Sequence, residues 1–285
     1  MKLCSYSING ESSFGAVTIS GEVVDVGRRL TGAHDLGTVL RQGRLDECAE
    51  IVATASADHA LSDITYEKPI ADPGKIFCIG VNYGGRNAEY RDGSSEQAKP
   101  SVFVRYASSL TAHLDDLVRP PESEQLDYEG EIVAVIGTAG RRIAEQDARH
   151  HIAGLTLGNE GTIRDWVRHA KFNVTQGKNW ESSGSVGPWM VTLDEIGSFD
   201  DLHLTTHVNG ELRQDDTPSS MMFSIEFQVA YLSTFCTLQP GDMIFTGTPT
   251  GAGARFDPPR FLRPGDVVEI SVPEIGTLRN GIRDE

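Results

Sequence analysis

A short apolar stretch that contains two glutamates most constrains the fold of this chain. Residues 126–137 read LDYEGEIVAVIG, and Glu129 and Glu131 lead into a run of Ile, Val and Ala. Successive side chains of a strand point to opposite faces, so the two glutamates share one face, with Cβ atoms about 6–7 Å apart. Apolar residues continue on both faces beyond Glu131, which indicates a strand that is buried on both sides.

Buried carboxylates are costly unless something pairs with them, so the pair has two interpretations. Glu129 and Glu131 are either solvated carboxylates at a sheet edge or ligands of a shared ion. A third candidate ligand, Glu160, follows a turn-prone Gly-Asn in LGNEGTIRDW. Three carboxylates without His or Cys companions suit a hard ion such as Mg²⁺ or Mn²⁺, so Glu129, Glu131 and Glu160 are candidate ligands of one divalent ion.

Cationic and hydroxyl groups near these glutamates are candidates for holding an anionic substrate. Arg164 lies four residues beyond Glu160, and Lys178 follows in TQGKNW. The loop FTGTPTGAG, residues 245–253, offers backbone N–H groups and the hydroxyl of Thr248 to a carboxylate. Each has an ordinary structural alternative: an exposed arginine that pairs with Glu160, a lysine in a polar loop, and a flexible turn.

The order of predicted elements indicates a β-rich mixed α+β protein with a small N-terminal unit. Residues 1–70 alternate weakly and then become helical at RLDECAEIVATA, and the Pro- and Gly-containing YEKPIADPGK marks a boundary before residues 71–285. Short strands dominate the second part. Their sequences are KIFCIGVN, SVFVRY, GEIVAVIG, GPWMVT, LTTHVNGELRQ with an Asn-Gly hairpin turn, DMIFTGTP and DVVEISVP.

Two helices are expected to interrupt these strands. One lies near residues 161–170, and the other spans TPSSMMFSIEFQVAYLSTFC, with Thr217 as its N-cap and Pro218 at its first position. The apolar stripe of the second helix comprises Ile225, Val229 and Leu232.

Composition excludes several classes of partner. A net charge of −16 argues against nucleic acid and anionic membrane surfaces, which attract positive proteins. No apolar run approaches the roughly 20 residues that span a bilayer, and the first residues, MKLCSYSING, lack the pattern of a signal peptide. Four scattered cysteines without a C-x-x-C favour a reducing compartment. We therefore expect a cytoplasmic protein that binds no nucleic acid or membrane.

The motifs KIFCIGVNY, LDYEGEIVAVIG, GNEGTIRDW, GKNW, GPWMVT, VNGELRQ, PGDMIFTGTPTGAG and FLRPGDVVEI occur in an order that resembles the fumarylacetoacetate hydrolase (FAH) family. The resemblance covers about residues 70–285. Within the family, the chain resembles the subgroup of 2-hydroxyhepta-2,4-diene-1,7-dioate isomerases and acylpyruvate hydrolase-like proteins. It implies a β-roll catalytic domain, a homodimer, and a Mg²⁺ or Mn²⁺ held by the three glutamates. It also implies a small anionic 2-oxo acid as substrate.

By position, the resemblance assigns substrate contacts to Arg164, Lys178 and Thr248. We predict catalytic roles for Lys178, Arg164 and Glu89. We place the substrate-binding residues at Tyr83, Arg86, Thr248 and His169. Many family members carry a His that activates water in a lid segment, but NYGGRNAEY has Arg86 at that position, and an arginine cannot serve as a neutral base. Many also carry Asp where this chain has Glu160. Glu89 is then the best remaining base, with His169 as an alternative.

The residues leave the reaction open. We predict a hydrolase that cleaves a C–C bond in an acylpyruvate or diketo acid, with an enolate as intermediate. The alternatives are a decarboxylase or isomerase of a related 2-oxo or dienoic dicarboxylic acid. A rival of another class is a non-catalytic binding protein on the same scaffold, which the missing lid His favours and the retained buried charges oppose.

Overall fold

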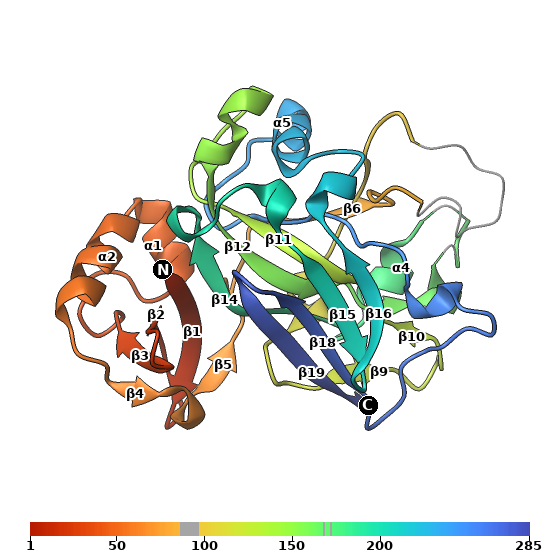
Figure 1. The fold of residues 1–285 in the computed structure, drawn as a ribbon, viewed down its shortest axis with the longest axis horizontal. Coiled ribbons are helices and arrows are strands. Elements are labelled where there is room, and N and C mark those ends of the chain that lie inside the picture. The colour runs from red at the N-terminus through yellow and green to blue at the C-terminus, as the bar shows by residue number, and fades with distance from the viewer. Residues whose placement is uncertain (86–96, 168, 172) are drawn as a thin grey trace.

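A computed structural model describes residues 1–85, 97–167, 169–171 and 173–285 (Figure 1). Arg86 and Glu89 of the predicted lid segment lie outside the described residues. Within the described part of the chain, no helix is long and apolar enough to cross a membrane.

The N-terminal unit combines antiparallel strands, which form one end of a larger sheet, with two helices (Figure 1). Helix α1 begins after Asp35, whose side chain accepts a hydrogen bond from the N–H of Thr38, and ends at Gly43, which adopts a left-handed conformation. The sequence pattern had predicted only the second helix, α2. The elements are β1 (Lys2–Ile8), β2 (Glu11–Val17), β3 (Glu22–Asp25), α1 (Leu36–Gln42), α2 (Leu45–Thr54), β4 (His59–Ala60) and β5 (Thr65–Glu67).

One large sheet runs from this unit into the remainder of the protein. Its strand order is β4-β3-β2-β1-β14-β12-β11-β17-β6-β7, with β5 paired to β1 and β8 paired to β14. The antiparallel pairing of β1 with β14 joins the N-terminal strands to the central ones. The further strands of this sheet are β6 (Ile76–Gly80), β7 (Ser101–Val104), β8 (Leu110–Thr111), β11 (Gly130–Ile136), β12 (Ile152–Asn159), β14 (Gly184–Thr192) and β17 (Met243–Phe245).

A second sheet packs on the central strands β11 and β12. Its order is β16-β15-β18-β19-β9, and β15 and β16 form the predicted hairpin, with positive φ at Asn209 and Gly210. Two short strands, β10 and β13, pair separately. The bounds are β9 (Leu117–Arg119), β10 (Leu126–Asp127), β13 (Thr162–Ile163), β15 (Leu204–Val208), β16 (Glu211–Asp216), β18 (Val267–Val272) and β19 (Gly276–Asp284).

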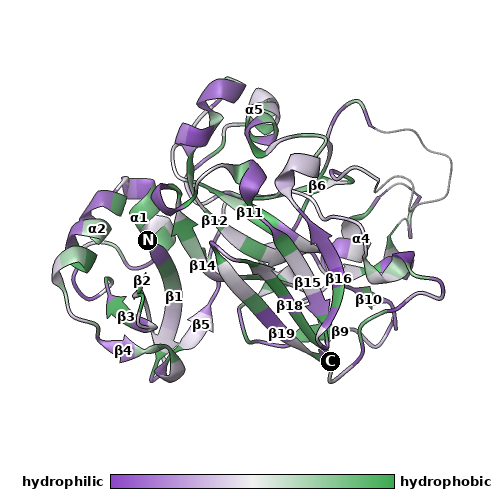
Figure 2. Cartoon of the chain, viewed as in Figure 1, coloured by the Kyte–Doolittle hydropathy of each residue, from purple (hydrophilic) through white to green (hydrophobic). Residues whose placement is uncertain are grey.

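Strand β11 is apolar on both faces because a separate part of the core covers each face. Ile132 and Ala134 pack in the cluster that includes residues of the second sheet, whereas Val133 and Val135 pack with residues of the N-terminal unit. Figure 2 shows the apolar colouring along the central strands. The prediction of a strand buried on both sides is confirmed, as is the β-rich mixed architecture.

The two helix predictions for the second part need correction. The described residues of this range form β13 and then a single 3₁₀ turn, η4 (Arg164–Trp166), because Thr162 and Ile163 pair with β10 as a strand. Helix α5 (Ile225–Phe235) begins at Ser224, whose hydroxyl accepts from the N–H of Phe227, so Thr217 is not its N-cap. Pro218 belongs to a separate 3₁₀ turn. The buried stripe of α5 is as predicted.

The remaining short elements are α4 (Thr175–Lys178) and the 3₁₀ turns η1 (Leu61–Asp63), η2 (Ala107–Ser109), η3 (Glu145–His151), η5 (Leu193–Glu195), η6 (Phe199–Asp201), η7 (Pro218–Ser220) and η8 (Gly253–Arg255).

Candidate metal and substrate centre

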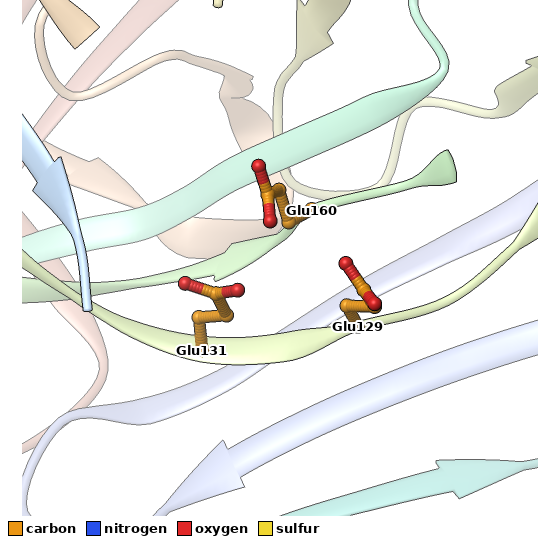
Figure 3. Close-up of side chains that lie close together, drawn as sticks. All are labelled: Glu129, Glu131 and Glu160. Atoms are coloured by element: carbon orange, nitrogen blue, oxygen red, sulfur yellow. The ribbon is translucent and has the colours of Figure 1, made fainter. Parts of the chain in front are cut away.

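The three predicted glutamates meet at one end of the central strands (Figure 3). Glu129 lies directly before β11, Glu131 is within it, and Glu160 directly follows the neighbouring strand β12. One carboxylate oxygen from each lies within 4.8 Å of the others, and the side chains are almost completely buried. They are therefore not solvated edge carboxylates.

The pairing of β11 with β12 sets the spacing of the glutamates. Gly130 lies opposite Asn159 and Glu131 opposite Gly158, and the N–H of Glu160 donates to the backbone oxygen of Glu129 at 2.8 Å. The side chain of Asn159 accepts from the N–H of Glu129 at 3.0 Å. Both backbone segments that carry carboxylates are thus held to each other by hydrogen bonds.

Two cations contact this carboxylate group. Lys178, at the end of α4, lies with its Nζ 2.5 Å from Glu129 Oε2 and 3.0 Å from Glu160 Oε2. Burial alone would lower the pKa of Lys178, but the charges of Glu129 and Glu160 outweigh it and raise the pKa. Arg164 Nη2 contacts Glu129 Oε1 at 2.7 Å. Both side chains are therefore charged and directed at the centre.

The third glutamate is the least compensated of the group. Burial, and then the charges of Glu160 and Glu129, raise the pKa of Glu131 well above its usual range. The N–H of Gly247 donates to Glu131 Oε2 at 2.8 Å and partly opposes this rise. A carboxylate with a raised pKa in such a group is one that a cation would stabilise strongly.

The centre fits a hard divalent cation. Glu160 Oε1 is buried and has no hydrogen-bond partner among the described residues. The donors are carboxylate oxygens, which Mg²⁺ and Mn²⁺ prefer, and no His or Cys belongs to the group. Lys178 and Arg164 are the cations that form ion pairs with members of this group of four buried carboxylates, which includes Asp127, in the part of the chain that the structure describes. A divalent ion would compensate this excess of negative charge.

The Gly- and Thr-rich loop lies at the centre but directs much of its hydrogen bonding to the protein itself. Thr248 donates its hydroxyl to the backbone oxygen of Gly130 at 2.9 Å and accepts from Gln214 Nε2 at 2.8 Å. The N–H of Gly247 binds Glu131, and the N–H of Gly253 binds Asp127 at 2.8 Å. This loop therefore orients carboxylates of the chain.

Tyr83 and His169 occupy different surroundings. Tyr83 is buried, and its hydroxyl has no partner within the described ranges. Burial, and then the charge of Glu131, raise the pKa of Tyr83, so its hydroxyl stays protonated. His169 is exposed and stacks on Trp166, with ring centroids 4.2 Å apart. A role for either residue in binding substrate stays a prediction.

Two residues of the centre were not predicted from the sequence. Asp127 is fully buried and accepts from Arg164 Nε at 2.7 Å, which orients that guanidinium. Asp127 lies two residues before Glu129, and residues two apart in a strand share a face. This spacing could have indicated Asp127 from the sequence. Arg105 is buried and donates to the backbone oxygen of Gly161 at 2.9 Å, directly beyond Glu160. Burial lowers the pKa of Arg105, and no sequence pattern marked it.

Known proteins resemble this chain over most of its length. The family model for the fumarylacetoacetate (FAA) hydrolase C-terminal region matches residues 75–283. Oxaloacetate tautomerase YisK of Bacillus subtilis (strain 168) is 41% identical over 228 residues, which are 79% of this chain and 75% of that protein.

Solved structures match the whole fold, including the N-terminal unit. A fumarylacetoacetate hydrolase from Exiguobacterium antarcticum superposes with a TM-score of 0.86 and 29% identity, covering 100% of both chains. A probable 2-hydroxyhepta-2,4-diene-1,7-dioate isomerase from Mycobacterium abscessus gives a TM-score of 0.80 and 30% identity, covering 100% of this chain and 99% of that one. The chain therefore belongs to the fumarylacetoacetate hydrolase family and is an enzyme of that superfamily.

Proposed function

We propose that the protein is a divalent-metal-dependent tautomerase that interconverts the keto and enol forms of a small 2-oxo dicarboxylic acid of the oxaloacetate type. The observation that carries the proposal is the buried triad of Glu129, Glu131 and Glu160 with Lys178 directed at it. The name of the Bacillus relative, which is 41% identical, favours tautomerisation over the hydrolysis that the sequence had led us to expect.

The three glutamates would hold Mg²⁺ or Mn²⁺, which when bound supplies positive charge that favours the enolate form of a 2-oxo acid. Lys178 remains protonated, so its Nζ can donate a hydrogen bond to the C2 oxygen, where negative charge develops. Arg164, which Asp127 orients, would bind a substrate carboxylate.

The lid sequence also favours tautomerisation. Hydrolysis requires an activated water, and the chain has Arg86 where many family members carry the His that activates it. Tautomerisation requires only that a proton leave C3 and that one reach the C2 oxygen. Glu89 remains our candidate base, with His169 as the alternative. Arg86 is then free to bind the second carboxylate of the substrate.

The test follows the decay of enol-oxaloacetate by ultraviolet absorbance with purified protein in Mg²⁺, in Mn²⁺ and in excess chelator. We expect acceleration with either metal and its loss in chelator. A panel of acylpyruvates in the same buffers tests hydrolysis. Release of pyruvate from an acylpyruvate, without any effect on enol-oxaloacetate, would replace our proposal by the hydrolase alternative. Unchanged turnover in excess chelator would contradict the proposed dependence of the activity on a metal ion.

A pair of lysine variants tests the centre itself. Lys178→Met removes the ammonium and keeps most of the stem, so kcat is expected to fall by about a hundredfold or more. Lys171→Met is the matched control, because Lys171 is exposed in the same connection. A rise in KM alone for Lys178→Met would assign this lysine to substrate binding rather than to charge stabilisation.

The homodimer implied by the family resemblance is also part of this proposal, and sedimentation of the purified protein tests it.

A further inference from the structure

A cavity of about 770 Å³ lies between the second sheet and the loop that precedes β18. Four arginines line it: Arg119 from β9, Arg213 from β16, and Arg260 and Arg263 from the loop. The protein as a whole carries a net charge of −16. Several guanidinium groups in one cavity of a protein with a strongly negative net charge indicate a site for an anionic ligand.

Two of these arginines are held side by side. Arg213 Nη2 and Arg260 Nη1 bind the same carboxylate, Glu211, at 3.1 and 2.8 Å. Both guanidinium groups also lie over the ring of Phe256, 5.0 and 4.7 Å from its centroid. One carboxylate and one aromatic ring thus fix the directions of two cations before any ligand arrives.

The positive charge at this end of the cavity is only partly compensated. Arg213 is 10% exposed at its side chain, and its Nε and Nη1 have no hydrogen-bond partner in the part of the chain that the structure describes. Among the described residues, Arg213 forms its ion pair with Glu211, and Arg260 shares this carboxylate. A largely buried guanidinium group that shares its carboxylate partner with a second arginine favours an anion close by.

The acidic residues of the lining leave Arg263 available. Asp266 uses its carboxylate to accept from Asn209 Nδ2 and from the backbone N–H of Arg263, both at 2.8 Å. The guanidinium of Arg263 itself forms no ion pair within the described residues. Arg119, by contrast, is paired with Asp284 at 2.7 Å, and Glu124 lies exposed in the lining. The arginines available to a ligand are therefore Arg260 and Arg263 of the loop and Arg213 of β16.

We propose that this cavity binds a small oxyanion, a phosphate or carboxylate group of a metabolite, with Arg213, Arg260 and Arg263 as its cationic contacts. Guanidinium groups are suited to such groups because their planar N–H donors match two oxygens at once. The volume exceeds that of inorganic phosphate, so the anion belongs to a larger molecule.

The cavity is separate from the carboxylate centre. None of the triad glutamates, nor Lys178, belongs to its lining. The two sites are neighbours, and backbone hydrogen bonds connect them. The backbone oxygen of Gln125 accepts from the N–H of Arg164 at 3.0 Å, and the N–H of Leu262 donates to the backbone oxygen of Leu126 at 2.8 Å. Binding in the cavity does not require the metal.

The experiment titrates the full-length protein with inorganic phosphate and, separately, with succinate by isothermal calorimetry. Each titration is run once with Mg²⁺ and once with excess chelator. We expect binding of one or both anions, with the same affinity in both buffers. Phosphate alone would identify a phosphorylated ligand, and succinate alone a carboxylate. Binding that needs Mg²⁺ would place the anion at the metal centre and overturn the proposal, as would no binding of either anion at millimolar concentration.

Charge-removing variants assign the binding to the cavity. Arg260→Gln and Arg263→Gln change exposed side chains, so the fold is expected to persist, and each is expected to weaken binding about tenfold or more. Arg41→Gln, an exposed arginine of α1, is the control and is expected to bind as the unaltered protein does. Equal affinity in all three variants would show that the anion binds elsewhere and would refute the proposal.

Discussion

At the scale of single residues, the centre gathers more carboxylates than cations that pair with them among the described residues. Lys178 bridges Glu129 and Glu160, and Arg164 bridges Glu129 and Asp127. Glu131 forms an ion pair with neither cation, and the hydrogen bond that its carboxylate accepts from the described residues comes from the N–H of Gly247. Burial, and then the charges of Glu160 and Glu129, raise the pKa of Glu131, so a bound cation would stabilise its charged form.

Glu131→Gln is expected to stabilise the metal-free protein and to weaken metal binding. Because the folded-state pKa of Glu131 is raised, its contribution to stability is present at acidic pH and is lost as pH rises through that pKa. Gln removes this loss and keeps an oxygen for the N–H of Gly247. Near neutral pH we expect the melting temperature in chelator to rise by about 2–4 °C for each kcal/mol of repulsion removed.

Calorimetric titration with Mn²⁺ supplies the second readout for Glu131→Gln, and the affinity is expected to fall sharply. Glu195→Gln is a suitable control, because Glu195 is an exposed carboxylate whose ion pair is with the N-terminal amine. An unchanged melting temperature together with an unchanged Mn²⁺ isotherm would mean that Glu131 is an ordinary buried acid rather than a ligand.

At the scale of elements, the close packing of β11 and β12 keeps the glutamates together. A Cβ atom on Gly158 would lie 2.3 Å from the ring of Phe245 and 2.8 Å from Val133, so only glycine fits between these strands. Gly158 lies opposite Glu131 and two residues before Glu160. The spacing of the carboxylates therefore depends on this contact.

Gly158→Ala is expected to destabilise the protein by about 1–3 kcal/mol, because the added methyl group forces β12 away from its neighbours. The same displacement shifts Glu160 relative to Glu131, so affinity for Mn²⁺ is expected to fall as well. Denaturant unfolding and metal titration measure the two effects. Gly197→Ala is the control, since a Cβ there meets nothing within 4 Å. Equal losses of stability in both variants would contradict the packing argument.

Features that depend on neighbouring residues could be predicted from the sequence, whereas contacts between distant residues could not. The alternation that brings Glu129 and Glu131 to one face is written in consecutive residues, so the strand and the carboxylate pair were predictable. Arg105 acts through Gly161, 56 residues further along the chain, and no local pattern reports such a contact. The start of α5 was misplaced because Thr217-Pro218 is itself a good helix start, but it opens the separate turn η7.

At the scale of the whole molecule, the N-terminal unit is joined to the remainder by more than the pairing of β1 with β14. The ring of Tyr66 in β5 packs edge-on against His113, with centroids 4.7 Å apart. His113 Nδ1 also accepts from the backbone N–H of Arg279 in β19 at 3.1 Å. One imidazole thus contacts strands from both ends of the chain. The division at residue 70 stays a prediction.

This contact predicts an acid-dependent loss of stability. Burial, with a further contribution from the charge of Arg279, lowers the pKa of His113 from 6.5 to about 4, although Asp115 opposes the shift. The unfolded chain takes up a proton near pH 6.5, whereas the folded protein does so only near pH 4. The stability associated with neutral His113 is therefore complete above pH 6.5 and is lost as pH falls toward 4.

His113→Gln removes the titrating group and keeps an acceptor for the N–H of Arg279, so it is expected to reduce the change in unfolding free energy between pH 6.5 and 4. Urea unfolding at several pH values measures this slope, with chelator present so that metal release does not contribute. His150→Gln, at an exposed histidine of η3, is the control and is expected to leave the slope unaltered. If the two variants and the unaltered protein lose stability in parallel as the pH falls, His113 is charged in the folded state and the contact between the two parts of the molecule does not depend on its neutral form.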